Sequence, residues 1–378
     1  NLKAFIVNRV GDLSLILGIG IIFSITGSLD YYAVFSNSQE IAQTELLLTS
    51  TLTVSALTAA CILLFGGAMG KSAQMPLHVW LPDSMEGPTP ISALIHAATM
   101  VTAGVFLLAR MSPLFELSTT ALSFVLIIGA TTALFTGILG LIQNDIKRVV
   151  AYSTLSQLGY MVAAAGVSAY SASLFHLMTH AFFKALLFLA AGSVIVALHH
   201  EQDIRKMGGL KNKLPITYVT SLIGSLALIG FPGFSGFFSK DALIEAIGHA
   251  DIIGSGFAYA SVLIGVFITA LYTFRLFFKV FHGALDEHHH DVKESPLSIT
   301  LPLVLLAIPS VIIAWPTVGP MVFGSYFTTA ISQPDAYEIF GYEFTSAYGF
   351  LIHAFSSPVI YIALFGVSTA YILYIQKP

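Results

Sequence analysis

The chain has 378 residues, of which 56% are apolar and only 10% charged, and its mean hydropathy is +0.84. Since soluble domains carry about 25% charged residues, this composition excludes a soluble globular domain and predicts a polytopic membrane protein. The net charge of -4 and the scattered basic residues exclude a nucleic-acid partner. The single cysteine, Cys61, excludes a disulfide framework, a cysteine-based zinc site and an iron–sulfur cluster.

Apolar segments long enough to cross a bilayer as helices, about 20 residues each, recur along the whole chain. They lie at residues 10–29, 46–80, 90–110, 118–142, 149–168, 172–198, 214–250, 256–279, 296–318 and 352–376. The second and the seventh are much longer than one crossing needs, and each contains a Gly/Pro interruption. We therefore expect an all-α polytopic membrane protein with about ten transmembrane helices, two of them broken.

Both interruptions are accompanied by a lysine. The first, FGGAMGKSAQMPLHVWLPDS at 65–84, contains Lys71, and the second, FPGFSGFFSKD at 231–241, contains Lys240 beside Asp241, a local counter-charge. A charge at bilayer depth costs about 2.5 to 3.5 kcal/mol on insertion scales. We therefore expect a charged residue at this depth to serve a function. Two Gly/Pro-interrupted helices in corresponding places are typical of an inverted-repeat transporter.

The positions of the breaks divide the chain into repeats. We expect residues 1–110 to supply the last three helices of a first repeat, 111–283 a complete five-helix second repeat, and 284–378 peripheral helices. Treating 214–250 as one broken crossing places nearly all loop Lys and Arg residues on one face, with only Arg110 on the other, as expected of a cytoplasmic face. The chain starts at Asn1 without an initiator methionine or a leader, which suggests a piece of a longer protein.

Titratable residues form a line between the two breaks. His176, His180 and Lys184 are four residues apart in an apolar helix, so they share one stripe with steps of about 6 Å. An imidazole titrates at about pH 6.5 and can carry a proton in either direction. A buried lysine changes its protonation state readily. Together with His96 in the segment 90–110, this stripe predicts a proton relay; a packing role is the alternative for His96. A metal site from the two histidines lacks a carboxylate or thiol in that helix.

Three further patterns are weaker. GGAMGKS at 66–72 is one residue too short for a phosphate-binding loop and follows an apolar helix instead of a strand. DEHHHD at 286–291 lies in an expected solvated loop, where adventitious metal binding is the simpler interpretation. Asp145, with Lys147 and Arg148, marks either a charged cytoplasmic turn or a proton inlet.

Several long blocks carry a resemblance to a known family. They are GKSAQMPLHVWLPDSMEGPTPISALIHAATMVTAG (70–104), QNDIKRVVAYSTLSQLGYM (143–161), FHLMTHAFFKALLFLAAGSVI (175–195), HHEQDIRKMGGL (199–210) and GFFSKDALIE (236–245). In this order they resemble the largest antiporter-like membrane subunit of respiratory complex I, the NADH:quinone oxidoreductase, over nearly the whole chain. The block at 199–210 resembles that subunit more than its two paralogues.

The resemblance implies a proton-translocating subunit with Lys71 as central carrier and His96 and the 176–184 stripe as connecting axis. Lys240 and Asp241 would then lie on the exit side, and Arg9, Asp12 and Asp145 would be supporting polar groups. It also implies no cofactor in this chain, because FMN, iron–sulfur clusters and quinone belong to other subunits. The implied partners are other membrane-arm subunits, especially the adjacent antiporter-like subunit, and the lipid bilayer. We expect the bilayer to be a bacterial inner membrane in preference to a mitochondrial inner membrane.

The family pattern extends beyond this sequence at both ends. It has helices before Asn1, one with a glutamate that pairs with the lysine matching Lys71, and a lateral helix beyond Pro378. Lys71 is therefore expected to lack its counter-ion here. Two other functions stay open: a subunit of a multi-subunit sodium/proton antiporter, and a non-transporting scaffold whose buried charges fix helix packing.

Overall fold

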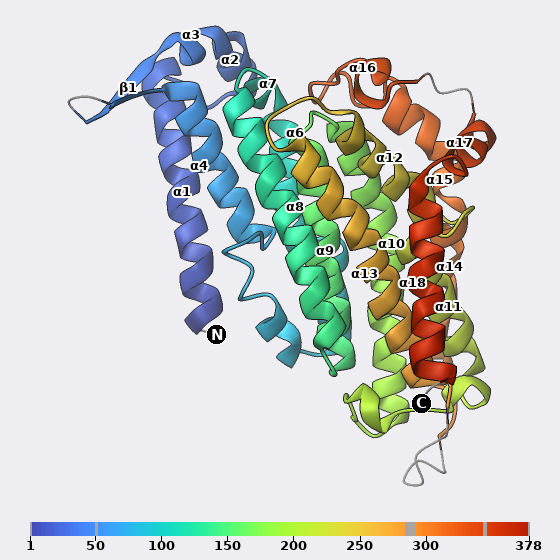
Figure 1. The fold of residues 1–378 in the computed structure, drawn as a ribbon. Coiled ribbons are helices and arrows are strands. Elements are labelled where there is room, and N and C mark those ends of the chain that lie inside the picture. Colours follow the sequence, from blue (N-terminus) through green and yellow to red (C-terminus); the bar gives the residue numbers. More distant parts are fainter. Residues whose placement is uncertain (1, 50–51, 284–291, 343–345, 377–378) are drawn as a thin grey trace.

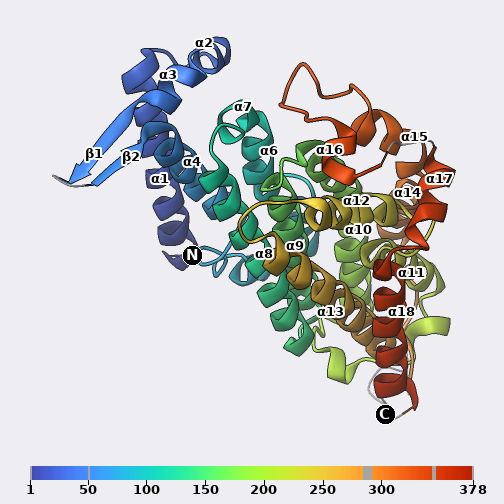
Figure 2. The same cartoon turned by 45° about the horizontal axis from the view of Figure 1, so that its top comes forward.

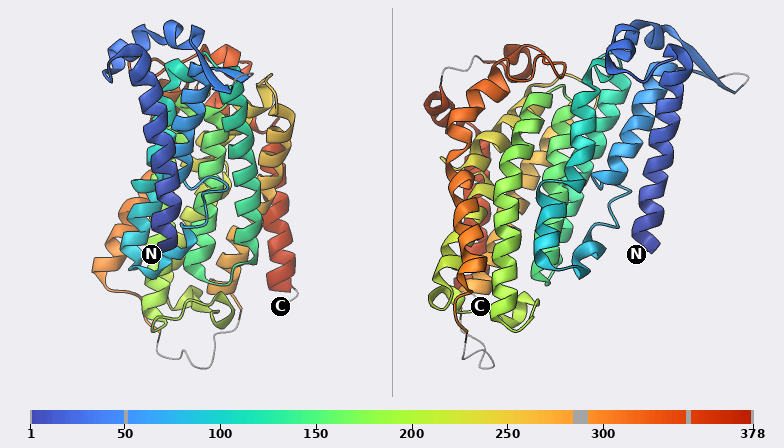
Figure 3. Two further views of the ribbon diagram at one scale, coloured as in Figure 1. Left: turned by 90° about the vertical axis from the view of Figure 1, so that its left-hand side faces the viewer. Right: turned by 180° about the vertical axis from the view of Figure 1, so that it is seen from behind.

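The computed structural model describes residues 2–49, 52–283, 292–342 and 346–376. Long helices stand side by side with nearly parallel axes, and the amino and carboxyl ends of the drawn chain lie at the same end of these axes (Figure 1). Turned views show that α1 lies on one lateral side of the bundle and that α14, α17 and α18 lie on the other side (Figures 2 and 3). The predicted helical multi-pass architecture is confirmed.

The main elements, in chain order, are α1 (Leu2–Thr26), α2 (Tyr31–Ser36), α3 (Ser38–Gln43), β1 (Glu45–Thr49), β2 (Leu52–Ser55), α4 (Ala56–Lys71), η1 (Pro82–Glu86), α5 (Thr89–Ala97), α6 (Ala103–Arg110), α7 (Ser112–Phe115), α8 (Thr119–Ile142), α9 (Ile146–Ala165), α10 (Tyr170–Ala197), α11 (Pro215–Ile229), α12 (Ser235–His249), α13 (Ser255–Phe281), α14 (Leu297–Ile312), α15 (Ala314–Val318), α16 (Ala336–Phe340), α17 (Ala347–Ala354) and α18 (Pro358–Tyr371).

The predicted number of about ten membrane helices is not confirmed. Within the described residues, six helices are long and apolar enough to cross a membrane, or seven if the bent pair α14–α15 counts as one span. The other expected spans fall short for physical reasons: α4 and α11 end at the breaks and are only 16 and 15 residues long. In α9, two basic residues and several polar ones lower the hydropathy.

The start of the second apolar segment is not a helix. Residues 45–49 and 52–55 form two antiparallel strands, β1 and β2, in which Glu45 pairs with Ser55 and Leu46 with Val54. The β-branched Thr and Val residues of this segment favour a strand over a helix, which hydropathy alone does not reveal. β1 and β2 lie with α2 and α3 at the end of the helix axes opposite the two termini (Figure 1).

The first break ends a helix without restarting it. Lys71 is the last residue of α4, and the apolar stretch 72–81 continues as turns before η1. The apolar run that ends at Pro82 is therefore not helical before η1, because Pro76 and Pro82 lack the backbone N–H that a helix interior requires. Lys71 thus lies at the point where α4 stops.

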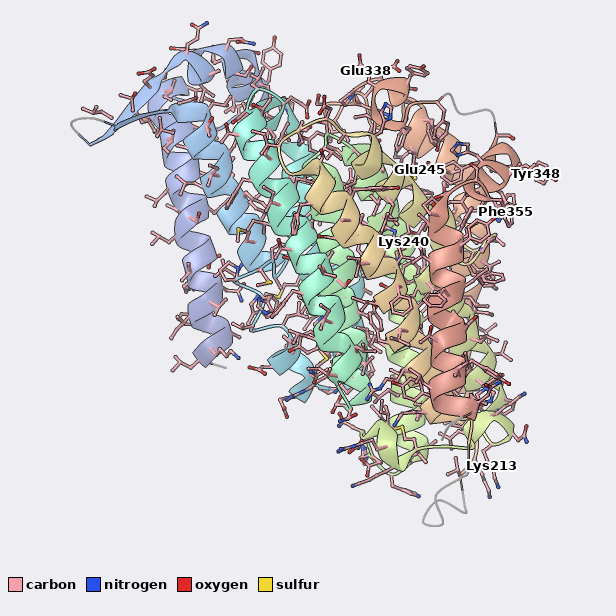
Figure 4. The ribbon with its side chains drawn as sticks, in the orientation of Figure 1. Lys213, Lys240, Glu245, Glu338, Tyr348 and Phe355 are labelled. Atoms are coloured by element: carbon pink, nitrogen blue, oxygen red, sulfur yellow. The ribbon has the colours of Figure 1, made fainter. Side chains whose placement is uncertain are left out.

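The second break separates two half-helices, α11 and α12, at the predicted Gly/Pro interruption. α11 starts with Pro215 in its first turn and ends at Gly230, whose φ of 79° favours glycine. α12 then continues toward the opposite end of the bundle, and α13 returns (Figure 1). The connections at 143–145 and 199–214 lie at the edge with the termini, where Lys213 is also found (Figure 4).

Another bend was not anticipated from the sequence. α14 and the helical stretch 314–323 meet at 45°. α14 contains Pro302 and Pro309, neither of which can donate a helical hydrogen bond. The bend lies beside the second break, because Ser235 Oγ donates to the Ser310 carbonyl and the Trp315 indole N–H donates to the Gly233 carbonyl.

Glycines bring α8 and α9 into close backbone contact. A β-carbon on Gly159 would lie 2.4 Å from the backbone nitrogen of Ala133, and one on Gly129 would lie 2.4 Å from that of Ala163. Small residues at such crossings let membrane helices pack by van der Waals contact. This contact fixes α9 in place, and α9 supplies polar groups to the site described below.

We predict that Gly159→Ala lowers the free energy of unfolding by about 1 to 3 kcal/mol, because the added methyl overpacks the α8–α9 contact. The matched control is Gly256→Ala, since a β-carbon there meets no atom within 4 Å. Thermal unfolding of the purified assembly in detergent measures both. Equal melting temperatures for the two variants would contradict the predicted contact.

Candidate functional site

The predicted stripe on α10 is present and enclosed. His176, His180 and Lys184 are each 0% exposed, and the two imidazole rings lie 6.1 Å apart. The spacing of four therefore has the predicted geometric consequence. Both ring nitrogens of His180 are buried, and the backbone of Ala97 is a polar group that faces the ring.

A second polar stripe on α9 faces the first and was missed in the sequence. Lys184 Nζ donates to Ser153 Oγ at 2.6 Å, and the Gln157 side chain lies 3.3 Å from His176 Nε2. Tyr160 continues the stripe one turn further along α9. Its signal in the sequence is the spacing of four and three between these residues in an otherwise apolar helix.

The two ring nitrogens of His176 have polar partners on different helices. Nε2 lies 3.3 Å from Gln157 Oε1 on α9, and Nδ1 lies 2.8 Å from Ser239 Oγ on α12. Ser239 Oγ also lies 2.7 Å from Thr179 Oγ1. His176 therefore connects α9, α10 and α12, with one nitrogen on each side.

Lys240 on α12 is buried without a hydrogen-bond acceptor in the described residues. It is 1% exposed, and its ammonium lies 5.1 Å from the centre of the Tyr160 ring. A cation–π contact of this kind replaces only part of the hydration of an ammonium. The position is therefore one where holding a proton is costly.

The predicted pairing of Lys240 with Asp241 is wrong. No ion pair joins them, and both Asp241 oxygens are buried with no hydrogen bond to a described residue. Neighbouring residues on a helix point about 100° apart, so adjacency in sequence separates the two side chains. Lys240 turns toward α9 and Tyr160, and Asp241 takes a different direction.

His96 on α5 joins the stripe from the other side. It is 0% exposed, its Nε2 lies 3.3 Å from Ser84 Oγ, and its ring stacks on Phe188 at 5.2 Å. Phe188 is one turn beyond Lys184 on α10. The structure thus brings His96 next to the end of the predicted line.

Lys71 has a counter-ion in this chain, contrary to expectation. Its Nζ lies 3.1 Å from Asp12 Oδ1, and Arg9 lies 3.3 Å from the other oxygen of Asp12. Gly11 and Gly70 allow this contact, because a β-carbon on Gly11 would lie only 3.0 Å from the Gly70 Cα. The described residues leave the Lys71 side chain 38% exposed, so they do not enclose it as they enclose Lys184.

Asp145 lies apart from the buried stripe. It caps α9 by accepting a hydrogen bond from the backbone N–H of Arg148 at 2.9 Å, and it forms an isolated bridge with Asp203. Both residues line a cavity of about 620 Å³ at the end of the bundle where α9 starts. Next to it, Lys147 Nζ donates to the Met85 carbonyl at 2.6 Å. Asp145 thus caps α9 at the rim of this cavity.

Within the described ranges no three His, Cys, Asp or Glu side chains come together as metal ligands. The DEHHHD segment at 286–291 lies outside the described residues.

The loop 199–206 at the same end is held by charge. The Arg205 guanidinium donates to the Asp203 carboxylate, with a shortest distance of 2.6 Å, and holds the pKa of Asp203 at about 2. A hydrogen bond from the Asp203 backbone N–H, assisted by Lys206, also lowers the pKa of Glu201. Both carboxylates are therefore charged in the folded loop at neutral pH.

Interrupted helices and ionisable groups buried between helices define an antiporter-like membrane protein. The chain belongs to the NADH:quinone oxidoreductase/Mrp antiporter transmembrane family, because the sequence model of that family matches residues 1–279. Its multi-pass helices and bacterial relatives agree with a location in the bacterial inner membrane.

Individual relatives carry related names. The chain is 56% identical to NADH-quinone oxidoreductase subunit L of Neisseria meningitidis, over all of this chain and 60% of that protein. It is 51% identical to NADH-ubiquinone oxidoreductase chain 5 of Marchantia polymorpha, over 83% of this chain and 48% of that one. A solved Mrp complex from Dietzia sp. DQ12-45-1b contains a chain with TM-score 0.80 and 24% identity, covering all of this chain and 40% of that one. The last likeness shows the fold alone, and the chain spans about 60% of the length of its Neisseria relative.

The acidic loop yields a pH prediction. Because the pKa of Asp203 is about 2 in the folded protein and 3.8 for a free aspartate, its charged form stabilises the loop above the free value. That stabilisation decreases below the free value and is lost as the pH falls through about 2. We expect pepsin to cleave at 199–206 at about pH 2 and not at about pH 4, and to cleave Asp203→Asn at both. Asp251→Asn, an exposed site at the opposite end, is the control; protection of Asp203→Asn at the higher pH would contradict the account.

Proposed function

We propose that the chain forms part of a proton-translocating membrane-arm subunit of NADH:quinone oxidoreductase. Protons would cross through the buried Lys/His relay, driven by quinone reduction elsewhere in the complex. The observation that carries the proposal is the complete burial of His176, His180 and Lys184 on one helix stripe. Ionisable groups enclosed by membrane helices are costly and mark proton or ion pathways. The identity to complex I subunits over the whole chain supports the same function.

The relay would work by rearranging hydrogen bonds. His176 has a polar partner at each ring nitrogen, so a proton that arrives at one nitrogen can leave from the other. The Lys184 ammonium donates a hydrogen bond to the Ser153 hydroxyl, which lies 2.6 Å from Nζ. Lys240, with no acceptor among the described residues, would hold a proton only transiently.

Lys71 and Asp12 would act as the loading switch. Two opposite charges about 4 Å apart attract each other by about 4 kcal/mol at an effective dielectric of about 20. A movement of α1 against α4 that separates Asp12 from Lys71 would remove most of this attraction and drive the proton onward. Arg9, which also pairs with Asp12, would hold the carboxylate when it leaves Lys71.

The arrangement of repeats, partners and cofactors completes the proposal. Residues 1–110 would belong to a first repeat, 111–283 would form the second, and 284–378 would pack at its edge. The partners would be other membrane-arm subunits, especially the adjacent antiporter-like subunit, together with lipid. FMN, iron–sulfur clusters and quinone would be bound by other subunits.

Two alternatives have distinct signatures. A subunit of a multi-subunit Na⁺/H⁺ antiporter would share the fold, and it would co-purify without flavin and iron–sulfur subunits. A non-transporting scaffold would keep proton pumping after Lys71, Lys184 and Lys240 are neutralised one at a time. The 56% identity to a complex I subunit favours the first proposal over the antiporter.

The decisive variant is Lys184→Met in the complete complex. We expect the rate of NADH-driven proton pumping in vesicles to fall about tenfold or more, since a positioned proton carrier contributes at least that factor. Lys213→Met, at an exposed lysine outside the bundle, should pump normally (Figure 4). Normal pumping by an assembled Lys184→Met complex would reject the relay.

A further inference from the structure

Glu245 on α12 forms a polar cluster with two residues from the segments that cover this end of the bundle. Its Oε2 accepts a hydrogen bond from the Tyr342 hydroxyl at 2.6 Å, and its Oε1 lies 3.3 Å from His353 Nδ1. The centres of the Tyr342 and His353 rings lie 4.6 Å apart, with the ring planes tilted by 37°. Glu245 lies further along α12 than Lys240, toward the end of the bundle where α16 and α17 lie (Figure 4).

Exposure increases along this line of groups. Lys240 and Asp241 are 1% and 2% exposed, the Glu245 side chain is 14% exposed, and the His353 side chain is 48% exposed. Asp241 and Glu245 are four residues apart, so they lie on the same side of α12 with a rise of about 6 Å between them. Both Asp241 oxygens are buried without a hydrogen bond to a described residue. Titratable groups therefore lead stepwise from the buried lysine to the surface.

We propose that Glu245 and His353 form the proton outlet of the second break, with Tyr342 as a positioning residue. The proposal rests on the function proposed above and extends its path beyond Lys240 and Asp241. The Lys240 and Asp241 side chains do not contact each other, so water would carry the proton from the Lys240 ammonium, which becomes a neutral amine, to the Asp241 carboxylate. Asp241 would then pass the proton to the Glu245 carboxylate. The carboxylic acid gives it to Nδ1 of neutral His353, and the imidazolium releases it to water.

A purely structural role would use the same contacts differently. If Glu245 only anchors α17 and the 341–342 segment on α12, the shape and the hydrogen-bond acceptor matter, and the exchangeable proton does not. Glu245→Gln keeps the side-chain length and an acceptor oxygen for Tyr342 but cannot carry a proton. Glu245→Asp keeps the titratable group but withdraws it by one methylene. An outlet thus tolerates Asp better than Gln, and an anchor tolerates Gln better than Asp.

The test compares both variants in the complete complex, reconstituted in vesicles with a pH-sensitive dye. We expect Glu245→Gln to lower the rate of NADH-driven pumping about tenfold or more, and Glu245→Asp to retain most of it. His353→Gln should also slow pumping. Glu338→Gln, which removes an exposed carboxyl on neighbouring α16, should pump normally (Figure 4).

A Lys240→Met variant separates the two proposals. Loss of pumping in Lys240→Met with normal pumping in Glu245→Gln would overturn the outlet and leave the relay standing. Better pumping by Gln than by Asp at position 245 would also overturn it, in favour of the anchor. Undiminished pumping in Lys240→Met would overturn the function of the second break and the outlet with it.

Discussion

The structure depends on the contact between two polar stripes that face each other inside an apolar bundle. α9 presents Ser153, Gln157 and Tyr160, and α10 presents His176 and Lys184. In hydrocarbon each of these groups would be costly alone, and the facing stripes pair Lys184 with Ser153 and His176 with Gln157. The pairing is incomplete, since Lys240 has no hydrogen-bond partner among the described residues. An incomplete polar line is suited to transport, because a fully satisfied one would hold its protons.

Close helix contacts place the charged groups. Gly11 and Gly70 let α1 approach α4, and this approach brings Asp12 to Lys71. Gly129 and Gly159 fix α9 on α8. Gly230 ends α11, so that α12 can start again with Lys240 in its second turn. Small residues and breaks therefore determine where the chain can hold a charge.

Sequence reasoning reached the features that depend on local periodicity. The stripe 176–184 follows from a spacing of four, and the single broken crossing at 214–250 follows from the distribution of basic residues.

Features that depend on contacts between distant segments could not be predicted from the sequence. The Lys71–Asp12 pair requires the close approach of Gly11 to Gly70, and the Glu245 cluster requires α17 to fold back over α12. Hydropathy alone did not distinguish the strands β1 and β2 from a helix. The Lys240–Asp241 pair failed because neighbours in a helix point apart. The roles of the relay residues stay predictions.

For the proposed relay to work, ordered water must join the enclosed amines and imidazoles within the bundle. A high-resolution map of the complete complex in a lipid environment can show this water. We expect ordered water beside His180 and Lys240 that links them to Lys184 and His176. A map in which apolar side chains fill those positions, with no water between the polar groups, would contradict it.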